Sequence, residues 1–412
     1  MGKEVAEAHG NGASKVRGGV RWLHRSIALA IAEVALILVL MPVLMLSGGC
    51  AGKGKPSGGT MSPSFSSQPT QPSQATQPTS KPSEQPTTQP TAPSTTSVSR
   101  GQSIPATRAK ALPSADPFPP VLRSDQWQAP IPLPGPINTA GAEDSPFVSP
   151  DGKEFYVFFT PDPNVPPQKQ LLDGVTGIWR ATRSGETWTE PERVLLSDTL
   201  ALDGCPTLQG ETLWFASVRA GSMGEIDVFT ARRGAAAGPT SGAGAATGGG
   251  GGAGGGAWTK WENAGAQLNK DFDIDEFHVT ADGMTLYFHS SRPGGYGGLD
   301  IWMTQKTENG TWGTPANLGP GVNTAADEGR PFLTSDGREL WFDRPGSKDP
   351  GPAVYRSVKA ADGKWGIAQE VISRFAAEPT LDDRGNIYFV HHYFTPDGKT
   401  MVEADIYVAY RK

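Results

Sequence analysis

The stretch from Ile274 to Asn323 reads IDEFHVTADGMTLYFHSSRPGGYGGLDIWMTQKTENGTWGTPANLGPGVN. It contains the pair Asp282-Gly283 between two short β-prone runs. Such a pair predicts a hairpin, because glycine adopts the positive φ of the turn without steric cost. A third β-prone run ends at Trp302, and Trp312 marks a fourth. The stretch therefore predicts four short antiparallel strands.

Four weaker copies of this stretch fill the rest of the chain after about Pro113. Each copy has a turn glycine that is followed within five residues by an apolar or aromatic run; the five turn glycines are Gly152, Gly210, Gly283, Gly337 and Gly385. A repeat of four short strands at this length is typical of a propeller blade. The predicted fold class is all-β, a five-bladed β-propeller.

The last copy ends at Lys412, directly after its third β-prone run, so its outer strand is missing. The segment from Asp125 to Pro130 supplies a candidate, because Trp127 and Pro130 have the Trp-x-x-Pro spacing of the other outer strands. Proline is tolerated on an outer strand, which can lack a backbone donor. We therefore expect the N-terminal strand to complete the last blade and close the ring, leaving no open edges.

Composition divides the chain into three parts. Residues 1–50 combine basic residues with the apolar run Val34 to Leu46, and they predict a signal peptide or membrane anchor. Residues 51–115 are rich in Pro, Ser, Thr and Gln and predict a disordered linker. Residues 116–412 form the predicted propeller domain, with a Gly-rich loop at 234–257 that buries no surface.

The sequence Leu46-Ser47-Gly48-Gly49-Cys50 resembles the lipobox of bacterial lipoproteins. This resemblance implies that Cys50 is lipidated and becomes the mature N-terminus. Ser47 departs from the pattern, since the family has its aliphatic residue three positions before the cysteine. An uncleaved anchor and a soluble secreted form are the alternatives. All three place the domain outside the cytoplasm, in the cell envelope and facing the periplasm or the exterior.

The repeats resemble the TolB-type, WD-like propeller repeats of bacterial envelope proteins. The resemblance covers about Ser124 to Lys412 and is carried by four phrases: SPDGKEFY (149–156), FHSSRPGGYGGLDIW (288–302), NGTWGTPANLGPGVNTAADE (309–328) and SDGRELWF (335–342). It implies a scaffold for envelope partners, either a protein or a cell-wall glycan. We expect a monomeric binding module held at the membrane by its N-terminal lipid or anchor, without catalysis of its own.

Charge and cysteine content exclude other classes. The net charge of -6 and the lack of a basic stripe argue against a nucleic-acid partner. Two cysteines in 412 residues cannot build a disulfide framework or a cysteine-based zinc site. We therefore expect no metal and no cofactor.

Acidic residues gather where the innermost strands are expected to begin, around one mouth of the central channel: Asp144, Asp275, Glu276, Glu328 and Glu378. Their near-repetition favours a structural role, and a cation or polar ligand at the mouth is the second interpretation. The third is a carbohydrate-active enzyme, because glycoside hydrolysis needs paired carboxyl groups. Five-bladed glycosidases place three acids on inner strands, and the candidates here are Asp144, Asp275 and Glu328.

Two Arg-Asp pairs occupy equivalent places across the Gly-rich loops of the second and third copies. They are Arg219 with Asp227 and Arg292 with Asp300. A catalytic residue has no reason to recur at the same place in successive blades. We therefore expect each pair to form an ion pair that holds its loop.

Overall fold

The structure is a computed structural model, and it describes residues 99–165, 175–196, 201–219, 221–224, 226–234, 258–259, 261–271, 274 and 276–412. The expected signal or anchor segment with Cys50, the linker up to residue 98, Asp275 and the loop 235–257 lie outside these residues. Among the described residues, no helix is both long and apolar enough to cross a membrane.

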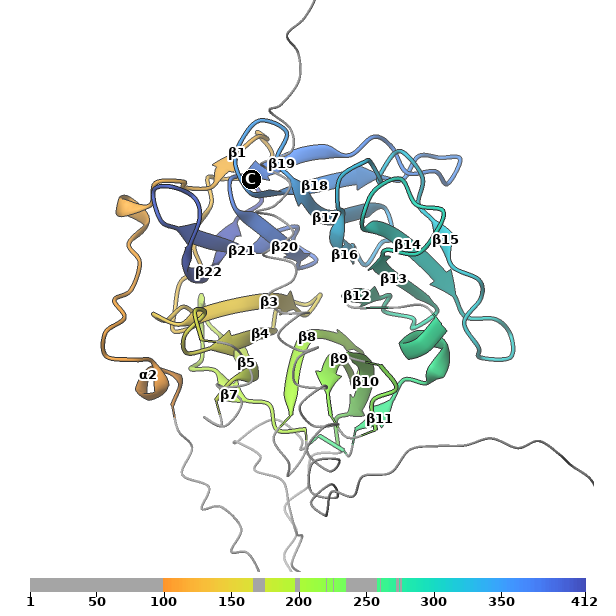
Figure 1. Cartoon of the computed structure of the whole chain (residues 1–412), viewed down its shortest axis with the longest axis horizontal. Helices are drawn as coiled ribbons and strands as arrows, with labels where there is room; N and C mark the ends of the chain where they lie inside the picture. The colour runs from red at the N-terminus through yellow and green to blue at the C-terminus, as the bar shows by residue number, and fades with distance from the viewer. Residues whose placement is uncertain are drawn as a thin grey trace, which may run out of the picture. The chain divides into compact units, whose positions relative to one another are not determined.

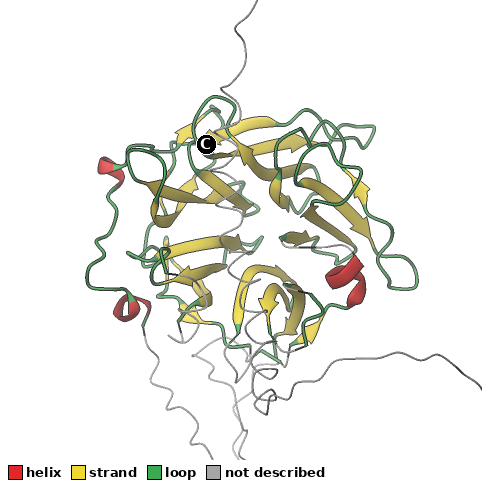
Figure 2. Ribbon diagram, in the orientation of Figure 1, coloured by secondary structure: helices red, strands yellow, loops and turns green. Residues whose placement is uncertain are grey.

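The described chain is almost entirely β-structure, and its sheets are arranged around a common centre in the manner of propeller blades (Figure 1, Figure 2). Its helical turns are short: α2 (Arg100–Ser103), η1 (Pro113–Ala115) and the π-helical turn η3 (Gln267–Asp271). The all-β prediction is confirmed in this respect.

Three sheets correspond to the second, third and fourth sequence repeats. Their strands are β1 (Val121–Leu122), β8 (Leu202–Gln209), β9 (Thr212–Val218), β10 (Asp227–Arg232), β11 (Glu262–Asn263), β12 (Phe277–Val279), β13 (Thr285–Ser290), β14 (Asp300–Gln305), β15 (Ala316–Asn317), β16 (Gly329–Leu333), β17 (Glu339–Pro345), β18 (Pro352–Val358) and β19 (Gln369–Ser373). The strand orders are β8-β9-β10-β11, β12-β13-β14-β15 and β16-β17-β18-β19, and β1 extends the last sheet beyond β19.

The first and fifth repeats share a nine-stranded sheet. Its strands are β2 (Ile131–Pro132), β3 (Ala142–Val148), β4 (Glu154–Thr160), β5 (Gly177–Ser184), β6 (Thr187–Trp188), β7 (Glu192–Arg193), β20 (Ala376–Leu381), β21 (Ile387–Phe394) and β22 (Met401–Ala409). Two antiparallel meanders, β3-β4-β5 and β20-β21-β22, meet at one parallel pair, Ala142 with Ala404. The N-terminal strand β2 pairs with β22, and Trp127 forms a bridge with Arg411. This is the place expected for the N-terminal strand, although the pairing begins at Trp127 and continues past Pro130.

The inner strands β3, β8, β16 and β20 share a β-bulge, visible as a register shift in each pairing with the neighbouring strand. Each shift encloses a residue with positive φ that is followed by proline; these residues are Ser145 (47°), Cys205 (50°), Arg330 (51°) and Glu378 (56°). A bulge accepts proline, which cannot donate to the ladder, and it changes the direction of a side chain. The repeated bulge therefore turns one side chain per strand toward the centre.

A repeated asparagine contact and aromatic packing join neighbouring repeats. Asn138, Asn269 and Asn323 precede the inner strands β3, β12 and β16, and each side chain bonds both the backbone N–H and the C=O of one residue in a third strand: Ile406, Val228 and Ile301 respectively. Aromatic packing adds to this, since Trp127 contacts Trp341 edge-to-face at 5.5 Å between ring centroids. The asparagine contact recurs because these three junctions between repeats have the same geometry.

The N-terminal segment is held by a buried arginine before it reaches β1. Arg100 is 1% exposed and donates to the carbonyls of Ile137 at 2.7 Å and Pro136 at 2.6 Å. Its guanidinium also lies 3.2 Å from the Glu143 carboxylate. Charge-assisted bonds of this kind hold α2 against the sheet of the first repeat.

Candidate functional site at the channel mouth

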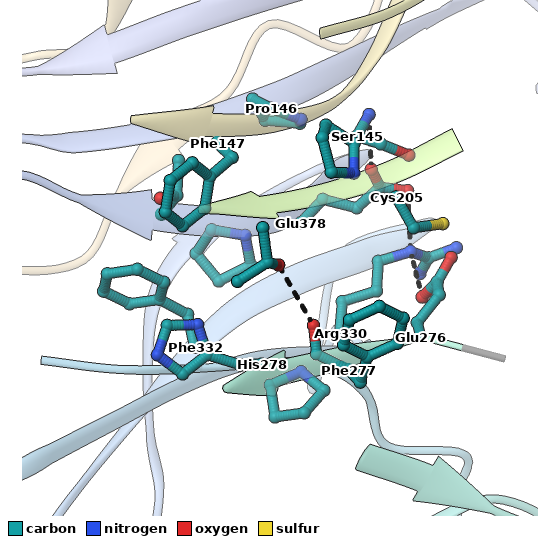
Figure 3. Close-up of a pocket in the computed structure, with 15 residues that line it drawn as sticks. Ser145, Pro146, Phe147, Cys205, Glu276, Phe277, His278, Arg330, Phe332 and Glu378 are labelled. Atoms are coloured by element: carbon teal, nitrogen blue, oxygen red, sulfur yellow. Dashed lines mark hydrogen bonds and ion pairs between the residues drawn. The ribbon is translucent and has the colours of Figure 1, made fainter. Parts of the chain in front are cut away.

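Five equivalent positions, one per repeat, surround a cavity at the centre of the molecule (Figure 3). They are Ser145, Cys205, Glu276, Arg330 and Glu378, and we call them the inner ring. The cavity has a volume of about 60 Å³. Four inner-ring residues keep partial exposure, and Glu378 is buried. The inner ring lies at the beginning of the inner strands, which we call the mouth end.

Arg330 is the centre of charge in the inner ring. Its Nε lies 3.0 Å from Glu276 Oε2 and 2.6 Å from Glu378 Oε1, and its Nη1 lies 3.1 Å from both carboxylate oxygens of Asp343. Burial alone would lower the pKa of Arg330, but the carboxylates of Asp343, Glu276 and Glu378 outweigh it and raise the pKa. The arginine therefore stays charged and holds three acids from three repeats in place.

Glu378 has a pKa well above the ordinary value of a glutamate. Burial is the main cause and the nearby Asp144 carboxylate adds to it, while Arg330 opposes them. The backbone N–H of Ser145 donates to Glu378 at 2.7 Å and to Asp144 at 3.0 Å. A buried carboxyl beside a second carboxylate holds its proton more strongly than an exposed one. The inner ring thus contains a carboxyl group with a raised pKa next to a second carboxyl group.

Two further titratable side chains adjoin the inner ring. His392 is buried with its Nε2 3.9 Å from Asp144 Oδ1, and burial lowers its pKa to about 4 although Asp144 opposes the shift. Burial raises the pKa of the Cys205 thiol, and the charge of Glu276 adds to the effect. At neutral pH the imidazole is uncharged and the sulfur is a thiol, which makes Cys205 a poor nucleophile.

A second layer of side chains lies two residues farther along each inner strand. It consists of Phe147, Thr207, His278, Phe332 and Thr380, all of them buried. The His278 and Phe332 rings pack at 4.7 Å between centroids, and burial lowers the pKa of His278 to about 4. These side chains form the floor of the cavity, so the space beneath the inner ring is small and largely apolar.

The sequence-predicted acids separate into two groups. Asp144, Glu276 and Glu378 meet around Arg330. Asp275 lies outside the described residues. Glu328 belongs elsewhere, because it accepts bonds from the backbone N–H and hydroxyl of Thr324 at 2.9 Å and 2.5 Å.

The Glu328 contact recurs in the first repeat. Glu143 accepts the same two bonds from Thr139, at 2.8 Å and 2.6 Å. Burial raises the pKa of Glu328 to about 6 and that of Glu143 to about 7. A contact repeated in this form organises the loop before an inner strand, so the trio of Asp144, Asp275 and Glu328 does not describe the inner ring.

The Gly-rich loops are ordered by contacts that differ from the expected ion pairs. Asp227 accepts from the backbone N–H groups of Met223 and Gly224 at 2.7 Å and 2.9 Å, and from Asn263 Nδ2 at 2.7 Å. Arg219 contacts Asp203 instead. The equivalent Asp300 repeats the pattern with Tyr296, Gly297 and Asn317. The aspartate closes its own loop because two backbone donors lie closer to it than the arginine does.

The two loop arginines lie over aromatic rings. The Arg219 guanidinium is 4.8 Å from the centroid of Trp261, and the Arg292 guanidinium is 5.3 Å from that of Trp302. A guanidinium over an aromatic face is held by cation–π attraction. The structural role expected for both arginines stays a prediction. The contacts observed for them include these aromatic rings.

Sequence reasoning did not single out Ser145, Cys205 and Arg330. A signal was present, because each of them directly precedes a proline, as Glu378 does. The turn glycine follows seven residues after Ser145, Arg330 and Glu378 and five residues after Cys205. Proline inside a central strand indicates a bulge. A recurring X-Pro pair on inner strands therefore could have identified the residues that face the channel. Among the described residues, no group of three or more His, Cys, Asp or Glu side chains is placed to hold a metal ion.

No family model matches the sequence, and no curated protein matches it. Solved structures do match. TolB from Acinetobacter baumannii is 14% identical with a TM-score of 0.33 over 67% of this chain, which spans only 55% of that protein. An exo-1,5-alpha-L-arabinanase from a bovine ruminal metagenomic library is 13% identical (TM-score 0.36, 67% of this chain and 94% of that one). The alpha-L-arabinofuranosidase catalytic domain of Coprinopsis cinerea is 11% identical (TM-score 0.41, 70% and 97%).

Proposed function

We propose that the chain is an extracytoplasmic binding module, a five-bladed β-propeller whose channel mouth holds a polar group of an envelope glycan. The divergence of the inner ring carries this proposal: five equivalent positions hold Ser, Cys, Glu, Arg and Glu. Side chains that serve only the fold have no reason to differ among equivalent positions. Differing polar groups on a rigid frame are typical of a binding site for an asymmetric ligand.

Support for five blades comes from the agreement between sequence repeats and strand groups. The five turn glycines each separate an inner strand from its neighbour, in β3-β4, β8-β9, β12-β13, β16-β17 and β20-β21. The single parallel pair between β3 and β22 fits a contact between adjacent blades rather than a continuous sheet. Placing β2 beside β22 then gives the last blade an outer strand from the N-terminal side.

The size of the cavity limits what part of a glycan it can hold. A volume of about 60 Å³ is far below the roughly 300 Å³ of the smallest typical ligand pockets. It has room for a hydroxyl, hydroxymethyl or carboxyl substituent, whose oxygens Arg330 and Glu276 can contact. The sugar ring itself would rest on the surface of the mouth.

Binding is tested with the full chain and immobilised cell-wall glycan. Glu276→Gln keeps the size of the side chain and removes one charge from the inner ring, so we expect affinity to fall about tenfold. The matched control is Glu308→Gln, an exposed carboxylate in the hairpin after β14. Unchanged affinity in Glu276→Gln, with a thermal midpoint equal to that of the parent chain, would contradict the proposal.

We also propose that the module is held at the membrane through Cys50, as a monomer. The support is the lipobox-like sequence after the apolar run and the linker that follows it. Mass spectrometry of the mature chain checks this: a chain that begins at a diacylated Cys50 agrees with it. A chain that retains its first 49 residues supports an anchor, and a soluble unmodified chain excludes both forms of attachment.

Glycoside hydrolysis is the second candidate, and a specific observation favours it. Burial and the nearby Asp144 carboxylate raise the pKa of Glu378 well above its ordinary value, and a carboxyl group with a raised pKa is a candidate general acid. One oxygen each of Glu276 and Glu378 contacts the same nitrogen of Arg330, at 3.0 Å and 2.6 Å. These two oxygens are therefore no more than about 5.6 Å apart, which is shorter than the roughly 6.5 to 9.5 Å typical of inverting enzymes.

Hydrolysis ranks second because Arg330 occupies the space between these acids and the cavity is smaller than a sugar ring. The two candidates separate in one comparison. Glu378→Gln removes the acidic proton but keeps a side chain of similar shape, so a binding module should keep most of its affinity, whereas an enzyme should lose its activity. Release of reducing sugar from arabinan, xylan or cell-wall glycan by the parent chain, abolished in Glu378→Gln, would favour the enzyme.

A further inference from the structure

A polar groove lies at the opposite end of the inner strands, between the turns of the first and fifth repeats. We call it the seam groove and define it by Lys153, Arg183, Asp382, Arg384, Tyr410 and Arg411. Its volume of about 610 Å³ is within the range of about 300 to 1,000 Å³ that is typical of small-molecule sites. It is ten times larger than the cavity at the mouth.

Basic side chains dominate the lining of the seam groove. Five lysine or arginine side chains face three acidic ones, in a chain whose net charge is -6. Two of the acids neutralise their own neighbours, since Asp151 lies 2.9 Å from Lys153 and Glu186 lies 3.5 Å from Arg183. A local positive surplus in an acidic protein attracts anions.

The third acid is satisfied without the arginines. Asp382 accepts from the backbone N–H groups of Arg384 and Asn386 at 3.1 Å and 3.0 Å, from Asn386 Nδ2 at 2.8 Å and from the Tyr388 hydroxyl at 3.1 Å. Within the described residues, neither Arg384 nor Arg411 has a carboxylate partner. Both are exposed, so their guanidinium donors are open to a ligand.

The position of Arg384 breaks the repeat. The corresponding turn residue is an aspartate in the first, third and fourth repeats: Asp151, Asp282 and Asp336. In each of those turns the aspartate accepts from a serine or threonine hydroxyl of its own turn. In the fifth repeat the side chain of Asp382 bonds the turn instead. The position that holds aspartate in the other turns is therefore free to hold a basic residue, Arg384.

The seam groove is a built feature rather than a gap between loops. The backbone N–H of Asp383 donates to the carbonyl of Pro150 at 2.7 Å and joins the two turns. Arg411 lies over Trp127 at 4.3 Å from its ring centroid, and its backbone N–H donates to Asn386 at 3.0 Å. These contacts hold the two turns together and position Arg411 before any ligand arrives, which lowers the entropic cost of binding.

We propose that the seam groove binds an anionic sugar, with a carboxylate or phosphate group on Arg384 and Arg411. Paired guanidinium groups match the geometry of both anions. The Gln128 amide and the Tyr410 hydroxyl also line the groove and can bond sugar hydroxyls. This site is independent of the channel mouth, because it lies at the other end of the strands.

Isothermal titration of the full chain with trigalacturonate and with glucose 6-phosphate tests the two sources of negative charge, and maltotriose is the neutral control. We expect saturable binding of at least one anion and none of maltotriose. Arg384→Gln and Arg411→Gln should each weaken that binding about tenfold. Raising the salt concentration from about 0.02 M to about 0.5 M should weaken it further.

The matched control is Arg338→Gln, an exposed arginine in the turn of the fourth repeat next to Asp336. It should leave binding unchanged, and so should Glu276→Gln at the channel mouth, which keeps this proposal separate from the first. The proposal is overturned if neither anion binds, if maltotriose binds equally, or if Arg338→Gln costs as much as Arg384→Gln.

Discussion

The two ends of the inner strands differ in how closely the repeats agree. At the turn end, the pairs Ser149 with Asp151, Thr280 with Asp282 and Thr334 with Asp336 make the same side-chain contact at 2.8, 2.6 and 2.6 Å. At the mouth end, four of the five inner-ring residues share a positive φ, yet the five equivalent positions hold four residue types. Equivalent positions of these repeats hold similar residues where the chain only has to turn. They hold different residues where the side chains face the central cavity.

The largest expected effect at the mouth end comes from Arg330→Ala. The change leaves Asp343 and Glu276 without their counter-charge in a poorly hydrated site, which should destabilise the chain by about 3 to 5 kcal/mol. Urea denaturation measures this loss. Arg330→Lys keeps the charge but not the two-oxygen contact with Asp343. The stability of this variant should therefore lie between that of Arg330→Ala and that of the parent chain. Equal stability of all three would show that the inner ring is not held by this arginine.

The two ends should also differ in their pH dependence. Burial raises the pKa of Glu328 to about 6 and of Glu143 to about 7 near the mouth end, whereas hydrogen bonds from Thr280 and Thr334 lower the pKa of Asp282 and Asp336 in the turns. A raised carboxyl pKa adds stability below the unfolded value near 4.5, and this stability is lost as pH rises through 6 to 7. A lowered carboxyl pKa adds stability above the unfolded pKa near 3.8, and this stability is lost when the pH falls below that value.

The free energy of unfolding should therefore be greatest at about pH 4 to 5 for these groups and decline toward pH 7. Chemical denaturation at a series of pH values measures the profile. In Glu328→Gln the decline between pH 5 and 7 should be smaller. A profile that rises steadily from pH 4 to 7 in the parent chain would contradict the assignment of these buried carboxyl groups.

A smaller and symmetric effect is expected at the turn end. Thr280→Val and Thr334→Val each remove one hydroxyl that bonds the turn aspartate, at a cost of about 1 kcal/mol. The two losses should agree within about 0.5 kcal/mol and add in the double variant, because the sites are distant. Unequal losses would mean that the turns are less equivalent than their contacts indicate.

The smallest effect is expected from Cys205→Ser, which replaces a half-buried thiol by a hydroxyl of similar size. We expect a change in stability of less than about 1 kcal/mol. Glycan binding should change if the channel mouth is the site, because Cys205 lines the cavity. A large loss of stability would instead assign the thiol to the fold.

The repeat period, the turn positions and the placement of Trp127 beside the last repeat could be predicted from the sequence, because each depends on local patterns. Of the inner ring, Glu276 and Glu378 were predicted at the channel mouth, but Ser145, Cys205 and Arg330 were not. The bulge changes which side chain of the strand faces the channel, and its sign in the sequence is the proline that follows each of these three residues. Asp227 was paired with Arg219 on position alone, yet nearby backbone donors compete better for its carboxylate. Side-chain partners depend on distances of a few tenths of an ångström, which spacing in sequence does not determine.

Arg100 has a mechanical consequence. The segment that follows it pairs as β1 with β19 and as β2 with β22, and these few backbone bonds are all that β1 and β2 add to the sheets. If the chain is pulled from its N-terminal side, the force reaches the buried contacts of Arg100 with Ile137, Pro136 and Glu143 first. Tension applied from this side is thus borne by the first repeat, and the strands near Trp127 remain unloaded until Arg100 has been extracted.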